Sequence, residues 1–390
     1  MSSKVIFVPY LDGFGGVERL VLTLSKFLHA RGVAHVVLCF RNPMKLEEFA
    51  TWPLTVSALQ CARNALAETT ALRSWMAKTT NSSPAESILA FDLKGALFAG
   101  LGRGPFVLHL TDPPSLLRDD VSKDAITFRH GYGERRSRTL ARIARAEIVH
   151  RLNTRGVRRA RAVVVMTHLI ATEIRHLYGV DPVIIRPGVE NAARKHVHNS
   201  NASRFRILSV CRLEESKRLS WVIQGLAELE RSESPLSRTV DWIFDLVGAG
   251  PAQLGLENLA KTLGLSDRIV FHGRVTDAEL ERRFQDAALF VMPAVQGYGL
   301  PALEALIRGV PVVVHERSGV SEILRDTPWV ELLNDDDGAD VARGLKRLTD
   351  RVLSGELVRT QPPDTPVADR WARQICAACG WNEDVILETD

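Results

Sequence analysis

Short apolar runs alternate with helical patterns along most of the chain. Residues 4–10 (KVIFVPY) form an apolar run, as expected of a strand that is buried on both faces of a parallel sheet. From Val17 to Leu28 apolar residues recur every three or four positions, which predicts a helix with one core-facing side. The run HVVLCF at 35–40 predicts a second strand. Strand, helix and strand in succession predict a right-handed βαβ unit and therefore an α/β sheet.

The same alternation ends near residue 189 and starts again near residue 205. The polar, aperiodic stretch between the two parts predicts a linker. Two successive α/β halves predict two Rossmann-like domains that face each other. We predict an N-terminal domain at 1–190, a linker at 191–204, a C-terminal domain at 205–369 and a last helix at 370–390 that returns to the first domain.

Composition is that of a globular protein with two domains. The chain has 390 residues, of which 45% are hydrophobic and 25% charged, and a net charge of +4. So small a charge argues against a dedicated nucleic-acid binder. Five scattered cysteines do not predict a disulfide framework. The first ten residues lack the features of a secretory signal, and no window of about 18 uninterrupted apolar residues occurs, so we expect a cytoplasmic location.

A glycine-rich loop, DGFGGVER, follows the first predicted strand. Gly15 and Gly16 lie where a strand leads into a helix, and their backbone N–H groups could approach an anion closely. A tight turn without a ligand is the equal alternative. A dinucleotide-binding loop would have a third glycine where this chain has Glu18, which disfavours a nicotinamide-dependent oxidoreductase.

Two cations follow the first strand of the second half. Arg212 comes directly after the strand, and Lys217 lies five residues later at the start of a predicted helix. Because arginine can hold two oxygens and lysine acts as a point charge, the pair fits a diphosphate. Two solvated cations near a helix start are the alternative for this stretch taken alone.

A second glycine loop lies within residues 291–314, between a predicted strand and a helix that Pro301 opens. We expect the N–H groups of Gly299 and Leu300 to point at phosphate oxygens. The pattern places Glu304 in the first helical turn, where its carboxylate could accept two hydroxyls of a ribose. A glutamate there is also ordinary helix-capping chemistry.

These motifs occur in a recognisable order. GFGGVERL, CRLEESK, DLVGAGP, RIVFHGRVTDAEL and PAVQGYGLPALEALIRGVPVVV, followed by SGVSEIL, resemble the landmarks of family-4 retaining glycosyltransferases with the GT-B fold. The resemblance covers residues 205–325 and 4–40 and is weak between 45 and 160. It implies two Rossmann-like domains facing each other across a cleft. It also implies retaining transfer of a sugar from a nucleotide-diphosphate sugar to an acceptor hydroxyl, in cell-envelope glycan or glycolipid assembly.

The resemblance further implies donor-side roles for single residues. In chain order these are Gly15, Gly16, Arg212, Lys217, Arg274, Val275, Gly299, Leu300 and Glu304. Arg212 and Lys217 would hold the diphosphate, and the first glycine loop would approach it from the opposite domain. Glu304 would bind the ribose. Arg274 and Val275 match the segment that borders the nucleobase.

Two further residues would lie near the reacting sugar. His109 matches a strand-end histidine of the family, although a lone histidine there is often only packed. The first of the family's paired glutamates falls at Gln296, which keeps hydrogen-bonding capacity but loses the negative charge. Two hypotheses follow: an active transferase, or a catalytically impaired homologue that binds a sugar nucleotide or partner without transfer. The absence of an evident carboxylate pair favours front-face transfer over double displacement.

Basic residues gather in one region. Residues 118–161 hold 13 Lys or Arg against 5 Asp or Glu, and part of the region predicts a basic amphipathic helix. Such a helix could lie on anionic lipid on the inner face of a membrane, and a solvated face is the equal alternative. We expect a nucleotide sugar and a glycan or lipid-linked acceptor as partners, and no nucleic acid.

An Asp-x-Asp pattern occurs within residues 333–342. It is a possible metal pair, but its place between a strand and a helix favours loop solvation and helix capping. The resemblance implies no need for a metal, so we expect neither a metal ion nor another cofactor.

Overall fold

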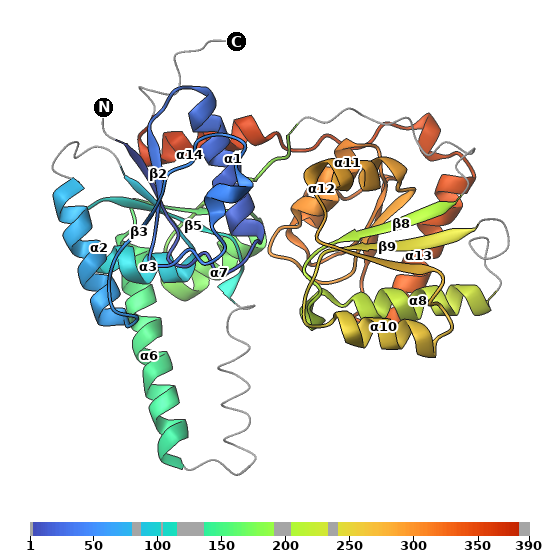
Figure 1. Ribbon diagram of the computed structural model, residues 1–390, viewed down its shortest axis with the longest axis horizontal. Helices are drawn as coiled ribbons and strands as arrows, with labels where there is room; N and C mark the ends of the chain where they lie inside the picture. The colour runs from blue at the N-terminus through green and yellow to red at the C-terminus, as the bar shows by residue number, and fades with distance from the viewer. Residues whose placement is uncertain are drawn as a thin grey trace. The chain divides into compact units, whose positions relative to one another are not determined.

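The computed structural model describes residues 3–79, 87–102, 104–114, 136–190, 204–232 and 241–381. The chain divides into two compact units, each built around its own sheet (Figure 1). Unit 1 comprises Met1–Pro187 and Ala368–Asp390, and unit 2 comprises Gly188–Val367.

Unit 1 contains a seven-stranded parallel sheet in the order β3-β2-β1-β4-β5-β6-β7. Its elements are β1 (Lys4–Phe7), α1 (Gly16–Ala30), β2 (His35–Cys39), η1 (Leu46–Phe49), β3 (Val56–Ala58), α2 (Ala65–Thr79), β4 (Ile88–Phe91), α3 (Asp92–Leu101), β5 (Phe106–Leu110), α6 (Arg136–Arg159), β6 (Ala162–Val165), α7 (His168–Tyr178), β7 (Val183–Ile184) and α14 (Ala368–Cys379). Helix α14 packs against α1, while α3 packs against α2 and α6 (Figure 1). Because helices cover the sheet, β4 and β5 are buried along their whole length.

Unit 2 contains a six-stranded parallel sheet in the order β10-β9-β8-β11-β12-β13. Its elements are β8 (Phe205–Val210), η2 (Glu215–Lys217), α8 (Leu219–Arg231), β9 (Trp242–Val247), α10 (Gln253–Thr262), β10 (Ile269–Gly273), α11 (Asp277–Asp286), β11 (Leu289–Met292), α12 (Leu300–Ile307), β12 (Val312–His315), η3 (Gly319–Glu322), β13 (Val330–Leu333), α13 (Gly338–Leu353) and η4 (Leu357–Arg359). Helices α8, α10 and α13 lie on one face of the sheet, and α11 and α12 on the other (Figure 1).

The two sheets share one topology. Counted from the first strand of each unit, the order is 3-2-1-4-5-6, and unit 1 adds a seventh strand at its edge. The prediction of two Rossmann-like α/β halves is therefore confirmed. In such sheets ligands bind at the carboxyl ends of the strands, where the strand order reverses. This switch point lies between β1 and β4 in unit 1 and between β8 and β11 in unit 2.

Prolines shorten two of the predicted strands. Strand β1 ends at Phe7, because Pro9 lacks the N–H that a central strand needs. The run predicted at 182–189 yields only the two-residue β7, flanked by Pro182 and Pro187. The predicted linker at 191–204 lies almost entirely outside the described residues.

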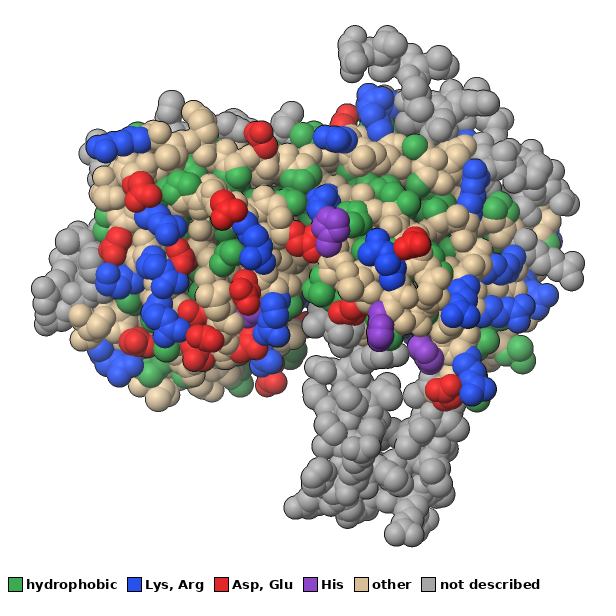
Figure 2. Space-filling model, turned by 180° about the vertical axis from the view of Figure 1, so that it is seen from behind, with side chains coloured by type: hydrophobic (Ala, Val, Ile, Leu, Met, Phe, Trp, Pro, Cys, Tyr) green, Lys and Arg blue, Asp and Glu red, His purple; other side chains and the backbone are tan. Residues whose placement is uncertain are grey.

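The surface carries both charges. On the face drawn in Figure 2, acidic and basic side chains of unit 2 are interspersed rather than gathered by sign. This agrees with the small net charge of +4. Charge differences between sites must therefore come from local groups at the sheet edges.

Candidate functional site

Two loops of unit 2 meet at its switch point. Lys217, in the turn η2 that follows β8, donates a hydrogen bond from Nζ to Oε1 of Gln296 at 2.7 Å. Gln296 follows β11, so the contact bridges the two strands between which the order reverses. Lysine can only donate, and the contact therefore orients the amide with Oε1 toward Lys217. The structure thus brings together two residues that the sequence analysis singled out separately. Helix α8 begins only at Leu219, so Lys217 precedes the helix rather than opening it.

Glycines of the neighbouring loop make room for the turn after β8. A Cβ atom on Gly248 would lie 1.9 Å from the carbonyl oxygen of Cys211, and one on Gly250 would lie 2.3 Å from that of Leu213. A Cβ atom cannot lie so close to a carbonyl oxygen. Only glycine at these two positions therefore lets the segment after β9 pack against the turn after β8. Arg212 lies in this turn with its guanidinium 2.9 Å from Glu214, and its side chain is 57% exposed.

The loop after β12 holds the loop after β11. The hydroxyl of Ser318 accepts a hydrogen bond from the Gln296 N–H at 3.1 Å and donates one to the carbonyl of Ala294 at 3.2 Å. Gly319 N–H donates to the Gln296 carbonyl at 3.2 Å. The backbone of Gln296 is therefore fixed on both sides. The sequence analysis quoted Ser318 within SGVSEIL but assigned it no role, because that role depends on a contact between the loops after β11 and β12.

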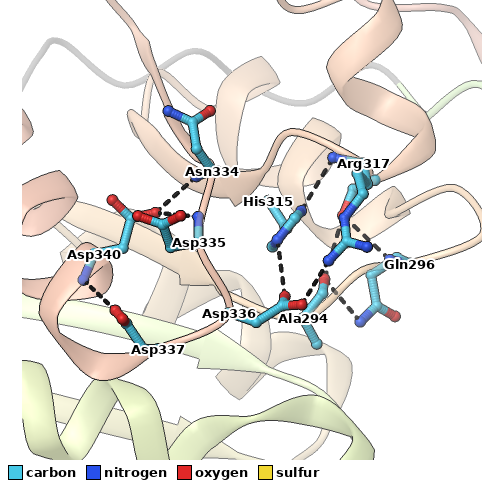
Figure 3. A network of polar contacts seen from close by, with 10 residues as sticks. Ala294, Gln296, His315, Arg317, Asn334, Asp335, Asp336, Asp337 and Asp340 are labelled. Atoms are coloured by element: carbon cyan, nitrogen blue, oxygen red, sulfur yellow. Dashed lines mark hydrogen bonds and ion pairs between the residues drawn. The ribbon is translucent and has the colours of Figure 1, made fainter.

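A buried histidine anchors the loop that carries Ser318. His315 has no exposed surface; its Nδ1 accepts from the Arg317 N–H at 3.1 Å, and its Nε2 lies 3.1 Å from Asp336 (Figure 3). Arg317 also donates to Asp336 at 2.6 Å. Burial lowers the pKa of His315, so the ring is neutral, with its proton on the nitrogen that faces Asp336. The signal in the sequence is a polar residue ending the apolar run VVVH, which the sequence analysis did not use.

The second glycine loop leads into α12. Gly299 has φ of +113°, and a Cβ atom there would lie 2.7 Å from Cε of Met292, so the position requires glycine. Helix α12 begins at Leu300, which puts Glu304 in the second turn. The prediction of a first-turn position for Glu304 is therefore wrong, because Pro301 is the second residue of the helix rather than its first. Glu304 is 7% exposed.

Arg274 and Val275 lie at the same edge of the sheet, between β10 and α11. Thr276 ends this segment by capping α11, with its hydroxyl accepting from the Glu279 N–H at 3.3 Å. Arg274 is exposed and Val275 half-buried. Both are separated from β8 by strand β9.

The first glycine loop caps helix α1 in unit 1. Gly15 N–H donates to Oε2 of Glu18 at 2.9 Å, so the carboxylate folds back over the start of its own helix. Gly16 is exposed, and a Cβ atom there would meet nothing within 4 Å. A dinucleotide-binding loop has its third glycine at the position where this chain has Glu18, which caps the helix.

An acidic residue with positive φ follows β4 directly and begins α3. Asp92 has φ of +59°, and its Oδ1 accepts hydrogen bonds from the hydroxyl and N–H of Thr111 at 2.7 and 3.3 Å. Burial raises the pKa of Asp92 to about 6, and the charges of Asp112 and Glu18 add to the rise, against the Thr111 hydrogen bonds. The switch point of unit 1 is therefore acidic.

His109 lies inside the sheet of unit 1. Its ring stacks on Phe91 at 5.1 Å and meets Trp371 of α14 edge-on at 6.1 Å. It has no exposed surface, and neither ring nitrogen has a hydrogen-bond partner among the described residues. Burial lowers the pKa of His109 to about 3. In this conformation the ring offers no surface to a substrate.

The acidic residues after β13 bind backbone groups (Figure 3). Asp340 accepts from the N–H groups of Asn334 and Asp335 at 2.7 and 2.9 Å, and Asp337 caps α13 by accepting from the Asp340 N–H at 2.8 Å. Over the part of the chain that the structure describes, no three His, Cys, Asp or Glu side chains are grouped to hold a metal ion. In the Asp-x-Asp pattern itself, Asp337 is thus a helix cap, and Asp335 pairs with Arg343 at 3.1 Å.

Comparisons with known proteins match both halves of the chain. Residues 14–192 match the family described as Glycosyltransferase Family 4, and residues 191–350 match Glycosyl transferases group 1. A D-inositol 3-phosphate glycosyltransferase of Streptomyces bingchenggensis is 30% identical over 45% of this chain and 42% of its own length. A GDP-mannose-dependent alpha-(1-6)-phosphatidylinositol monomannoside mannosyltransferase of Mycolicibacterium smegmatis is 30% identical over 42% of each chain. The matched part thus spans less than half the length of these relatives.

Solved structures resemble the whole chain. Anabaena Alr3699/HepE in complex with UDP and glucose has a TM-score of 0.66 and 18% identity, covering 99% of this chain and 100% of its own. WaaG, a glycosyltransferase involved in lipopolysaccharide biosynthesis, has a TM-score of 0.65 and 16% identity over 99% and 100%. At these identities the likeness shows the fold.

Proposed function

Because this chain belongs to the family-4 glycosyltransferases with the GT-B fold, we propose that it transfers a sugar from a nucleotide-diphosphate sugar to an acceptor hydroxyl, with retention of configuration. The observation that carries the proposal is the contact between Lys217 and Gln296 across the switch point of unit 2. Lys217 provides a positive charge at that point, and the first turn of α12, into which the loop after β11 leads, provides backbone N–H donors. A diphosphate needs both.

The donor would lie along the carboxyl edge of unit 2. In this proposal Lys217 and Arg212 bind the diphosphate together with the N–H groups of Gly299 and Leu300, which as first-turn groups lack intrahelical partners. Glu304 would bind the ribose. The exposed segment before α11, Arg274 and Val275, would border the nucleobase, and Gly15 and Gly16 of unit 1 would approach the diphosphate. The UDP and glucose named for the HepE structure support a nucleotide-sugar donor.

The chemistry would be a front-face transfer. The diphosphate leaves as the acceptor oxygen bonds to the same face of the anomeric carbon, and a phosphate oxygen takes the acceptor's proton. Gln296 orients the sugar, since an amide is no base. His109 would act only through packing, because its ring is buried between Phe91 and Trp371. We propose that no metal takes part, since Asp335 pairs with Arg343 and Asp337 caps α13.

Turnover tests this proposal. Release of free UDP or GDP from a panel of sugar nucleotides identifies a donor, and NMR of the product gives the anomer. We expect Lys217→Ala to lower turnover at least a hundredfold, because it removes the charge beside the leaving group. Lys261→Ala, on the exposed last turn of α10, is the matched control and should retain full turnover. Measurable donor binding without any release would instead support a catalytically impaired homologue.

We propose a lipid-linked or glycan acceptor presented at an anionic membrane surface. The mannosyltransferase relative is named for a phosphatidylinositol acceptor, which supports a lipid. Much of the basic region at 118–161 lies outside the described residues, but α6 is a 24-residue helix. Near its end Arg158 donates to the Tyr178 carbonyl at 2.8 Å and Arg159 to that of Gly100 at 2.7 Å, while Arg155 is exposed. No helix within the described ranges could cross a bilayer.

Sedimentation with vesicles tests the surface. We expect binding to phosphatidylglycerol vesicles that weakens as salt rises and is absent with phosphatidylcholine alone. Equal binding to both, or none to either, would contradict a charged docking surface.

A further inference from the structure

The amide of Gln296 presents a hydrogen-bond donor that a glutamate could not supply. Its Oε1 already accepts from Lys217 at 2.7 Å, and its Nε2 donates weakly to the Ala294 carbonyl at 3.3 Å. An amide nitrogen carries two N–H groups. The second has no partner among the described residues. A glutamate at this position would present only acceptors, so the substitution inverts what the side chain can recognise.

The same amide leaves a positive charge uncompensated. Lys217 contacts a neutral group, whereas two nearby arginines have carboxylate partners: Arg212 lies 2.9 Å from Glu214, and Arg317 lies 2.6 Å from Asp336. A glutamate at position 296 would neutralise Lys217 by a direct ion pair. Glutamine instead leaves one ammonium and one N–H side by side.

We infer that Gln296 and Lys217 select a donor whose sugar carries a carboxylate, as in the uronic acid class. This inference rests on the proposed function, in which the sugar lies directly beyond the diphosphate that Lys217 binds. A sugar hydroxyl that accepts from the Gln296 N–H gains one neutral hydrogen bond and leaves the charge of Lys217 unchanged. A carboxylate needs only donors, and its charge pairs with the ammonium.

Calorimetric titration of matched donors tests the inference. The pairs UDP-glucose with UDP-glucuronate, and GDP-mannose with GDP-mannuronate, differ only in the group at C6. UDP and GDP alone report nucleotide binding, and UDP-N-acetylglucosamine offers an uncharged carbonyl acceptor. We expect the wild-type protein to bind the uronate about tenfold more tightly than its neutral partner, in line with a charge-assisted hydrogen bond.

Two variants separate charge from hydrogen bonding. Gln296→Glu should reverse the preference, because it neutralises Lys217 and repels a carboxylate. Gln296→Met keeps the length and removes the N–H, so the preference should shrink to the contribution of Lys217 alone. Unchanged thermal unfolding of both variants shows that the loop after β11 remains folded.

If UDP or GDP alone binds the protein, three results would overturn the inference and leave the proposed function intact. They are equal affinity for uronate and neutral sugar, tighter binding of the N-acetyl sugar than of the uronate, and equal weakening of bare UDP and the uronate in Gln296→Glu. The last result would place the amide on the diphosphate. If no nucleotide or sugar nucleotide binds, the proposed function fails, and the inference fails with it.

Discussion

The two switch points share a topology but differ in charge. In unit 2 the loops after β8 and β11 bring Arg212 and Lys217 to the edge of the sheet beside the neutral Gln296. In unit 1 the corresponding loops bring Glu18 and Asp92. One strand order therefore carries two cations at the switch point of one unit and two carboxyl groups at that of the other. The chemistry lies in the loops and not in the fold.

The buried histidines repeat the contrast. His315 accepts a hydrogen bond at Nδ1, lies 3.1 Å from Asp336 at Nε2 and anchors the loop that holds Gln296. His109 has no polar partner at either ring nitrogen among the described residues and packs between aromatic rings. Burial lowers the pKa of both. The polar groups of unit 2 are thus fixed in place by one another, whereas His109 is a polar residue inside an apolar core.

The largest expected effect is on the free energy of unfolding, and it differs between the two glycine loops. Gly299→Ala should destabilise unit 2 by about 2–3 kcal/mol, because φ is +113° and the new Cβ would lie 2.7 Å from Met292. Gly16→Ala should leave stability unchanged or raise it slightly, since alanine favours helices and the space is open. Denaturant titration measures both. Equal destabilisation would show that the loops are not built differently.

Acid should destabilise unit 1 through His109. Its folded pKa of about 3 lies below the ordinary value of 6.5, so stability is complete above pH 6.5 and is lost as pH falls toward 3. The loss at pH 5 is about 2 kcal/mol. His109→Phe should remove this acid-induced loss of stability and leave the stability at pH 8 unchanged. Thermal unfolding measured across pH tests both expectations.

The variant His109→Phe also tests whether His109 takes part in catalysis or is only a packed residue. Turnover within about threefold of wild type is expected, because the ring has no exposed surface. A hundredfold fall in turnover with normal folding would show that the ring reaches the reacting groups.

Ser318→Ala should lower turnover about tenfold with little change in donor affinity. The hydroxyl fixes the Gln296 backbone and touches no substrate, and the loss of two hydrogen bonds costs about 1–2 kcal/mol of positioning. Steady-state kinetics separate kcat from KM. Rescue by Ser318→Thr is expected, and a variant that changes only KM would contradict a positioning role.

The last prediction concerns the carboxyl groups at the switch point of unit 1. The pKa of Asp92, about 6, is raised above its ordinary 3.8, so its stability contribution is complete below pH 4 and declines as pH rises through 6. Asp92→Asn keeps the acceptor for Thr111 and tolerates the positive φ. It should gain about 2–3 kcal/mol at pH 8 relative to pH 4. A gain independent of pH would show that burial of the charge is not the cause.

Sequence patterns predicted the fold class because apolar strands and amphipathic helices alternate with a regular period. They did not predict where β1 ends, since Pro9 interrupts an otherwise uniform apolar run. They also misplaced Glu304, because the helix start depends on the backbone of Gly299 rather than on Pro301.

The candidate site was predicted only in its parts. Lys217 and Gln296 each had a local signal, but their contact joins residues 79 positions apart and depends on strand order. Ser318 opens the quoted motif SGVSEIL but received no role, and His315 lies outside the quoted motifs, because their roles arise only when β11 and β12 lie side by side. Roles set by neighbouring loops cannot be recovered from either loop alone.

The central claim is that a nucleotide diphosphate binds at the cationic switch point of unit 2. Calorimetric titration of UDP and GDP into wild type, Lys217→Ala and Asp92→Asn tests it most directly. We predict that one of the two nucleotides binds the wild-type protein. Its affinity should be about a hundredfold lower for Lys217→Ala and within about threefold of wild type for Asp92→Asn. Equal affinity of wild type and Lys217→Ala, or a greater loss in Asp92→Asn, would contradict the claim.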